Sequence, residues 1–370
     1  MNRLNPVSVF SLVCVVLIGL CLSNCAPSGS GTVSGSGSAT GGSSSLNDSA
    51  KFLAGMGGGG SARLKRLRNT PEWKAHAAQM DKLWSYHRGR ASQLRSFRGQ
   101  AGVSASTVFY PFGGPDYLHA DALFSSSTYV LVGLEGVDSM PDLESLSDEE
   151  IFRGLRGIAN SLKTVTGASY FITKDMRVDL QSTRFRGTLP LILVMAARSG
   201  QNISSAQPVG ISSGGSITSR SAGSACPGWQ IKAGGRTIYY FKKDLSNGGL
   251  RDSRLLKFVS SRGSHVTFVK SASYLMHGGG FSTIKNYILN NSKGIIQCPS
   301  GIPYRDIKNA GWKIKLYGNY TGPMSLFSSK HQSDLAAAYR TGSPHPVKPI
   351  KFGMGYLVNP SRACVIVGTR

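Results

Sequence analysis

One stretch of the sequence, residues 108–135, constrains the fold more than any other. Residues 108–112 are apolar or aromatic, and the turn 113–116 (Gly-Gly-Pro-Asp) follows them directly. After a short helical segment, residues 129–135 form a second apolar run that ends in the acid Glu135. Because a strand, a connecting helix and a second strand make up a βαβ unit, this order predicts a βαβ unit at the start of the domain.

Segments typical of strands and helices interleave through the rest of the chain. The clearest helices are expected near 147–165 and 189–197, and the clearest strands near 265–270 and 312–317. Gly234-Gly235 lies between two further strand-like runs and predicts a hairpin. We therefore expect a single layered α/β domain over residues 63–370, with a mixed or mostly parallel sheet.

The N-terminal residues 1–24 have the layout of an export signal, with Arg3 as the single charge before a long apolar run. Residues 22–25 (Leu-Ser-Asn-Cys) resemble a bacterial lipobox, although Asn stands where a small residue is usual. The resemblance implies that Cys25 is lipidated after cleavage. It also implies sorting to the outer membrane, because Ala26 rather than an aspartate follows the cysteine. An ordinary cleaved signal and an uncleaved anchor helix remain alternatives.

The segment after the cysteine is rich in glycine and serine, which make up 21 of the 37 residues in 26–62. Such a composition is typical of a flexible coil with a reach of roughly 30–35 Å. We therefore expect residues 25–62 to form a disordered tether between the lipidated cysteine and the domain.

The charge balance indicates anionic partners. The chain has 42 Lys and Arg residues against 18 Asp and Glu residues, which gives a net charge of +24. Anionic lipid, lipopolysaccharide and wall polymers would all attract such a surface. The sequence has no zinc-finger or RNA-binding signature, so no specific nucleic acid is expected.

A basic amphipathic helix is predicted to begin at Thr70, which precedes Pro71 and Glu72 as an N-cap. Trp73, Met80 and other apolar residues recur on one face of this helix. Either this face packs on the core while the basic residues are solvated, or the helix rests on anionic lipid near the tether.

The cysteines after the signal region are Cys226, Cys298 and Cys364. Three thiols allow at most one intramolecular disulfide and leave one thiol free. Their spacing does not say which pair would form it.

Gly113 and Glu135 are separated by about the spacing that dinucleotide-binding folds use between the glycine turn and the ribose-binding acid. The unit also resembles the first βαβ unit of Rossmann-like methyltransferases, in which that acid binds the ribose of S-adenosylmethionine. The glycine series is incomplete, and Asp116 and Asp121 disfavour a phosphate at the helix start. Export also separates the domain from cytoplasmic cofactors. We therefore expect no cofactor. Residues 108–135 then form either a degenerate version of such a fold, a turn that packs on the core, or a pocket for a small ligand.

Several polar residues lie at or just after predicted strand ends, where open α/β sheets bind ligands. We predict that they line one crevice: Asp116, His119, Asp121, Glu135, Lys270 and Arg305. The seven histidines lack the spacing of a metal site, and none is predicted.

Residues 210–214 (Gly-Ile-Ser-Ser-Gly) match the nucleophile motif of α/β-hydrolases. No helix is expected after Ser212, and glycine and serine are abundant in the chain. The match is therefore attributed to composition, and a hydrolase remains an alternative only.

Residues 110–116 (Tyr-Pro-Phe-Gly-Gly-Pro-Asp), 129–135 and 187–191 together resemble an uncharacterised family of bacterial exported proteins, over residues 70–370. This resemblance implies no known activity. The expected protein is a lipoprotein at the periplasmic face of the outer membrane, most simply a non-catalytic envelope-associated binding protein. The alternative is an enzyme with a degenerate transferase-like or hydrolase-like site between residues 113–116 and Glu135.

Overall fold

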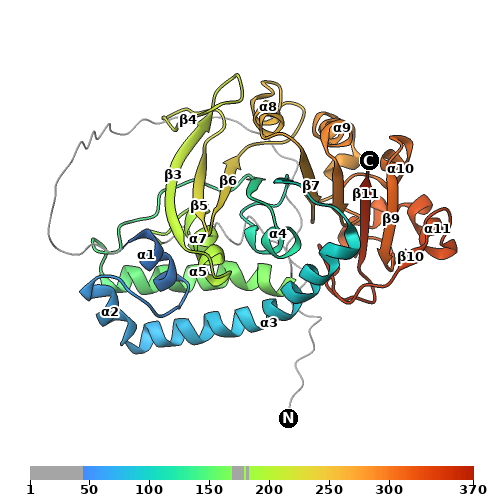
Figure 1. Cartoon of the computed structure of the whole chain (residues 1–370). Helices are drawn as coiled ribbons and strands as arrows, with labels where there is room; N and C mark the ends of the chain where they lie inside the picture. Colours follow the sequence, from blue (N-terminus) through green and yellow to red (C-terminus); the bar gives the residue numbers. More distant parts are fainter. Residues whose placement is uncertain (1–44, 169–178, 181–182) are drawn as a thin grey trace, which may run out of the picture. The chain divides into compact units, whose positions relative to one another are not determined.

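The centre of the fold is an open mixed sheet of eleven strands (Figure 1). The computed structural model describes residues 45–168, 179–180 and 183–370. The predicted signal peptide, Cys25 and the tether up to residue 44 lie outside the described residues. Across the sheet the strands follow the order β10 (Val347–Lys348), β9 (Lys313–Gly318), β11 (Cys364–Thr369), β8 (Gly294–Gln297), β7 (His265–Val269), β1 (Thr107–Tyr110), β2 (Thr128–Gly133), β6 (Arg236–Lys242), β5 (Gly228–Ala233), β3 (Ile203–Ile211) and β4 (Ile217–Ser219).

The five central strands, β8-β7-β1-β2-β6, are parallel to one another. Numbered by their order along the chain they read 5-4-1-2-3, which is the core order of the classic Rossmann sheet. Antiparallel strands extend the sheet on both sides, with β11 next to β8 and β5 next to β6. The predicted α/β class with a mixed sheet is therefore confirmed, and β1, α4 and β2 form the βαβ unit.

Helices cover both faces of the sheet, because side chains of the central strands alternate between two apolar cores. Tyr110 and Leu131 belong to the first core, whereas Phe109 and Val130 belong to the second. The first core also contains side chains of α1 (Leu46–Leu53), α2 (Ala62–Arg68), α3 (Pro71–Ala101), α4 (Tyr117–Leu123), α5 (Asp148–Ala168) and α7 (Leu189–Arg198). The second contains side chains of α8 (Arg254–Ser261), α9 (Ser282–Asn291), α10 (Tyr304–Asn309) and α11 (Ser333–Thr341).

The long helix α3 begins as the sequence predicts. The Thr70 side chain accepts a hydrogen bond from the Trp73 amide, and Pro71 is the first helical residue. Trp73, Met80 and Trp84 are buried, so the apolar face packs on the first core. Of the two interpretations offered for this helix, the packed one holds for its apolar face, which leaves the basic face for solvent or partners.

The folded region begins earlier than the sequence analysis expects. Residues 46–53, assigned there to the tether, form helix α1, with Ser45 as its N-cap. Phe52 and Leu53 are fully buried, and the Trp73 indole donates a hydrogen bond to the Phe52 carbonyl. The prediction of a coil up to residue 62 is wrong because the glycine and serine content of the whole segment masked one short capped amphipathic run.

Two further local predictions have clear outcomes. Among the described residues, Cys226, Cys298 and Cys364 are all buried and free, and no disulfide joins any two of them. Ser212 lies in the turn of the β3–β4 hairpin, so no helix follows it and the nucleophile-elbow geometry is absent at this position. Among the described residues, no helix is both long and apolar enough to span a bilayer.

Candidate functional site

The sheet has a topological switch point between β1 and β7. From β1 the chain proceeds to β2 and β6 on one side, and later to β7 and β8 on the other. In open α/β sheets, ligands bind outside the carboxyl ends of strands at such a point. The residues that follow β1 and β7 are therefore the first place to look for a site.

Three of the predicted site residues meet at this point. The ammonium group of Lys270, which follows β7, lies 2.5 Å from Oδ2 of Asp116 in the turn after β1. The Nδ1 atom of His119 lies 2.9 Å from Oδ1 of the same carboxylate. Tyr110 at the end of β1 donates its hydroxyl hydrogen to Oδ2 at 3.0 Å. We call these four residues the switch-point cluster.

The switch-point cluster is closed to solvent, since Asp116, His119 and Lys270 are each 1% exposed. Burial alone would raise the pKa of Asp116, but the attraction of His119 and Lys270 holds that pKa far below its usual value. Burial lowers the pKa of His119 to about 4, although Asp116 opposes the shift. The cluster is therefore a compensated buried ion pair of Lys270 and Asp116, with the His119 ring within hydrogen-bond distance of the same carboxylate.

Asp116 also shapes the local backbone. Its side chain accepts a hydrogen bond from the His119 amide and so caps helix α4. The Asp116 carboxylate thus caps the helix, binds Lys270 and accepts a hydrogen bond from the Tyr110 hydroxyl. These roles are structural. They occupy Asp116, which the sequence analysis predicted to line a ligand crevice.

The glycine turn after β1 is packed against the protein's own side chains. A side-chain carbon at Gly113 would overlap the ring of Tyr110. One at Gly114, whose φ is +57°, would lie 3.1 Å from the carboxylate of Glu135. In dinucleotide-binding folds, such glycines let the pyrophosphate of the cofactor approach the protein backbone closely. Here the space beside the glycines contains Tyr110 and Glu135.

Glu135 is held in this position by β6. The Tyr240 hydroxyl lies 2.9 Å from Oε2 of Glu135 and 3.1 Å from its carbonyl oxygen. Both residues are buried. Burial and the nearby Glu135 carboxylate raise the pKa of Tyr240 well above its usual value, so the phenol stays a donor. Tyr240 is a partner that the sequence analysis missed, because nothing in β6 signals its contact with a residue 105 positions away.

The remaining predicted residues do not join the cluster. Asp121 on α4 accepts a hydrogen bond from Tyr117 and forms an ion pair with Arg236. Arg305 is exposed on α10. Glu135 lies at the end of β2, as expected, but its carboxylate bonds Tyr240. The predicted single crevice of six residues is therefore reduced to Asp116, His119 and Lys270.

Backbone strain is concentrated beside the switch point. Phe112 after β1 and Ser271, Ser273 and Tyr274 after β7 all have φ between +51° and +63°. Residues other than glycine rarely adopt this left-handed backbone conformation, and each such residue lowers the stability of the fold by about 1–2 kcal/mol. The Tyr356 hydroxyl binds this segment through the Ser271 carbonyl at 2.9 Å and the Ser273 hydroxyl at 2.8 Å.

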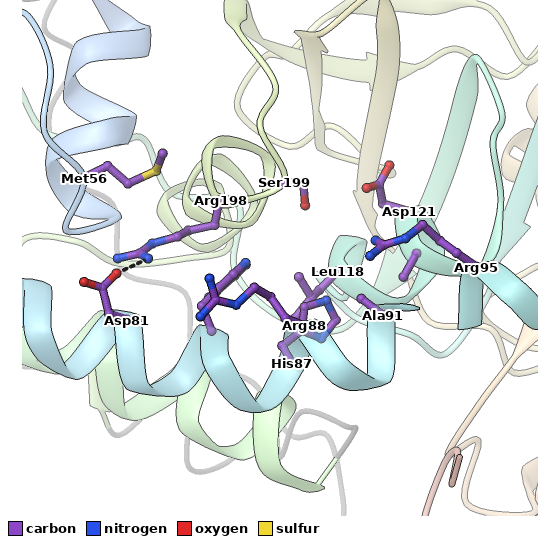
Figure 2. Close-up of a pocket in the computed structure, with 12 residues that line it drawn as sticks. Met56, Asp81, His87, Arg88, Ala91, Arg95, Leu118, Asp121, Arg198 and Ser199 are labelled. Carbon is purple, nitrogen blue, oxygen red and sulfur yellow. Dashed lines mark hydrogen bonds and ion pairs between the residues drawn. The ribbon is translucent and has the colours of Figure 1, made fainter. Parts of the chain in front are cut away.

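A separate cleft lies on the first-core face, between α3, α4 and the end of α7 (Figure 2). Its volume is about 610 Å³. It is lined by Met56, Asp81, Trp84, His87, Arg88, Ala91, Arg95, Leu118, Asp121, Ala122, Arg198 and Ser199. We call it the basic cleft. The sequence analysis missed it, apart from Asp121, although the pattern Arg88-x-x-Ala91-x-x-x-Arg95 is a visible signal of two arginines with a small residue between them.

The charges of the basic cleft fall into two groups. Arg198 is paired with Asp81 at 2.5 Å and also donates to the Ala54 carbonyl, and Asp121 is paired with Arg236. Arg88 and Arg95, in contrast, are exposed on α3. Within the part of the chain that the structure describes, neither guanidinium has a hydrogen-bond or ion-pair partner. The cleft therefore carries two uncompensated positive charges.

The described ranges contain no group of three or more His, Cys, Asp or Glu side chains arranged to hold a metal ion. The two regions with chemical interest are thus the closed switch-point cluster and the open basic cleft. Searches with family models, curated proteins and solved structures found no match to this chain.

Proposed function

We propose that the protein is a lipid-anchored component of the bacterial cell envelope that binds an anionic partner and catalyses no reaction at the switch point. The observation that carries the proposal is the occupied glycine turn. Tyr110 lies over Gly113 and Glu135 lies over Gly114, where a Rossmann cofactor would approach the backbone. A site filled by the protein's own buried side chains favours a binding protein over an enzyme.

The strand order supports a degenerate transferase-like origin. The parallel order β6-β2-β1-β7-β8 is that of the classic Rossmann core, and the first βαβ unit resembles that of Rossmann-like methyltransferases. A shared fold does not carry a shared activity, because function depends on the site. At this site, the acid that would hold a ribose is bonded to Tyr240 instead.

The predicted lipid anchor supports the proposed location in the cell envelope, and the net charge supports an anionic partner. The lipobox-like residues 22–25 favour lipidation of Cys25 and an outer-membrane location facing the periplasm. The net charge of +24 favours anionic lipid, lipopolysaccharide or a wall polymer as the partner. The basic face of α3 remains available because its apolar face packs on the core.

Metabolic labelling with a clickable fatty acid tests the anchor. We expect label in the wild-type protein and none in Cys25→Ala. Equal labelling of the two proteins would contradict lipidation at this cysteine.

A thermal-shift screen of the full-length protein in a non-ionic detergent tests the binding class. We expect anionic envelope components to raise the melting temperature and nucleoside cofactors to leave it unchanged. Stabilisation by a nucleoside cofactor alone would overturn the proposal.

An enzyme is the second candidate, and the strained segment 271–274 favours it. Positive φ values at three non-glycine residues near a switch point are typical of functional sites. Incubation with S-adenosylmethionine and a panel of envelope acceptors would reveal a transferase. Turnover that is lost in Ser273→Gly but kept in the control Ser253→Gly, a left-handed serine at the start of α8, would favour this candidate.

A further inference from the structure

We infer that the basic cleft is a binding site for a phosphorylated ligand, which Arg88 and Arg95 hold. The inference goes beyond a general basic surface, because it names one cavity and two residues. It rests on the proposed function only for the source of the ligand in the envelope. Binding of soluble anions tests the cleft without reference to lipidation.

The spacing of the two arginines suits a shared ligand. Arg95 lies seven positions after Arg88, so the two are about 10.5 Å apart along the helix axis and on nearly the same face. Ala91 lies between them and its small side chain leaves the space above the helix open. Figure 2 shows the side chains of α3 facing Leu118 and Asp121 of α4 and Arg198 and Ser199 at the end of α7.

The charges of the cleft select an anion. The two carboxylates in its lining are already neutralised, Asp81 by Arg198 and Asp121 by Arg236. Arg88 and Arg95 thus supply a net charge of about two, which a phosphate ester or a diphosphate would match. Guanidinium groups bind phosphate oxygens with two parallel hydrogen bonds, which gives direction as well as charge.

The walls of the cleft suit an organic phosphate better than a bare ion. Met56, Trp84, Leu118 and Ala122 line it together with the arginines. A volume of about 610 Å³ is that of a small-molecule site and far exceeds the size of one phosphate group. The cleft therefore fits a phosphorylated headgroup or a small phosphorylated metabolite whose carbon portion contacts the apolar wall.

His87 is a built-in reporter for this site. It lines the cleft, is 4% exposed, and makes edge contacts with the rings of Trp84 and His119. Burial and the neighbouring His119 lower its pKa to about 3, with Arg90 and Arg95 acting in the same direction and Asp116 opposing. A bound anion would offset the positive field of Arg95 and raise the pKa of His87.

The binding test is isothermal titration calorimetry of the full-length protein in non-ionic detergent, with pyrophosphate as the probe. Arg88→Gln/Arg95→Gln removes both free charges. The matched control Lys74→Gln/Lys82→Gln removes two exposed charges of the same helix that lie outside the cleft lining. We expect the arginine variant to lose about tenfold or more in affinity, as for the loss of charge-assisted hydrogen bonds. We expect the lysine variant to stay within about twofold of wild type.

The outcomes decide the inference in either direction. No pyrophosphate binding by the wild-type protein, or an equal loss in both variants, would overturn it. Nuclear magnetic resonance of His87 at neutral pH provides a second readout, since pyrophosphate should shift its ring signals in wild type and leave them unchanged in the arginine variant. Unchanged His87 ring signals in wild type at saturating pyrophosphate and neutral pH would also overturn the inference.

Two further arms identify the source of the phosphate. Glycerol 3-phosphate represents a soluble ligand, and vesicles of phosphatidylglycerol in phosphatidylcholine represent a lipid headgroup. If the arginine variant loses vesicle binding together with pyrophosphate binding, the site holds a lipid headgroup. If it loses only the soluble anions, the site holds a free phosphorylated ligand, and the proposed envelope association depends on other residues.

Discussion

The switch-point cluster and the basic cleft are neighbours that treat charge in opposite ways. The rings of His119 in the cluster and His87 in the cleft are 5.6 Å apart. In the cluster, Lys270 is buried against Asp116 at 2.5 Å. In the cleft, Arg88 and Arg95 are exposed and have no ion-pair partner among the described residues. The first arrangement favours stability of the fold, and the second leaves binding energy available for a ligand.

The comparison separates two consequences of mutation. Removing one member of a buried ion pair leaves an uncompensated charge in a medium of low dielectric constant, which is strongly destabilising. Removing an exposed charge without a partner changes stability little. Variants of the cluster should therefore destabilise the protein strongly, and variants of the cleft should spare the fold but weaken ligand binding.

Acid is expected to have the largest effect, through His87 and His119. Their folded-state pKa values are about 3 and about 4, below the unfolded value of about 6.5. Between these values the unfolded chain binds more protons, so stability is present near pH 7 and falls as the pH decreases towards 4. Urea unfolding at several pH values should show a loss on the order of 5 kcal/mol for the two together. The decline should be shallower in His87→Phe. A stability of the wild-type protein that does not change from pH 7 to 4 would contradict the claim that buried histidines make the fold sensitive to acid.

Lys270→Met should cost about 4 kcal/mol, because it leaves Asp116 buried without its cation. Chemical unfolding measures the loss. The double variant Lys270→Met/Asp116→Asn removes both charges and should be less destabilised than the single variant. A single-variant cost below about 1 kcal/mol would mean that the cluster is not a compensated pair.

Tyr240→Phe should cost about 1.5 kcal/mol, since the buried carboxylate of Glu135 loses a hydrogen bond of 2.9 Å. Thermal unfolding checks the value, and Tyr86→Phe on the exposed surface of α3 is a matched control. If instead Tyr240→Phe stabilised the protein, the closed position of Glu135 would not be the favoured one.

Ser271→Gly should stabilise the protein by about 1 kcal/mol. Glycine relieves the positive φ of +54° and removes a buried hydroxyl that has no hydrogen-bond partner among the described residues. Part of the gain is offset by the greater freedom of glycine in the unfolded chain. Denaturant midpoints of the two proteins decide the sign, and a loss of stability would indicate that the left-handed backbone at Ser271 is not strained.

Arg88→Gln should have the smallest effect on stability, within about 0.5 kcal/mol. Its melting temperature is therefore expected to match wild type while its pyrophosphate affinity falls. A large drop in melting temperature would show that Arg88 stabilises the fold, and the contrast between the two regions would disappear.

Local sequence signals predicted the framework well. The turn 113–116 between two apolar runs gave the βαβ unit, and Thr70, Pro71 and Glu72 gave the start of α3. Asp116 and Lys270 were correctly placed at one edge, because both follow strands of the parallel core and that core has a fixed direction. These features depend on neighbouring residues or on the direction of strands.

The missed features depend on long-range packing. Glu135 turns towards Tyr240, and no pattern in β2 or β6 announces that contact. The basic cleft exists because α3 lies beside α4 and α7. The sequences of these three helices do not indicate which of them are neighbours in the fold. Helix α1 was missed because a capped run of eight residues lies within a segment dominated by glycine and serine.

The most direct test of the account titrates one preparation of the full-length protein with S-adenosylmethionine and then with pyrophosphate. The account predicts no binding heat for the nucleoside cofactor and saturable binding of pyrophosphate that Arg88→Gln/Arg95→Gln weakens by about tenfold or more. Stoichiometric binding of S-adenosylmethionine that is lost in Glu135→Ala, with no binding of pyrophosphate, would contradict it. That result would mean that the switch point is an open cofactor site and that the cleft is an ordinary surface hollow.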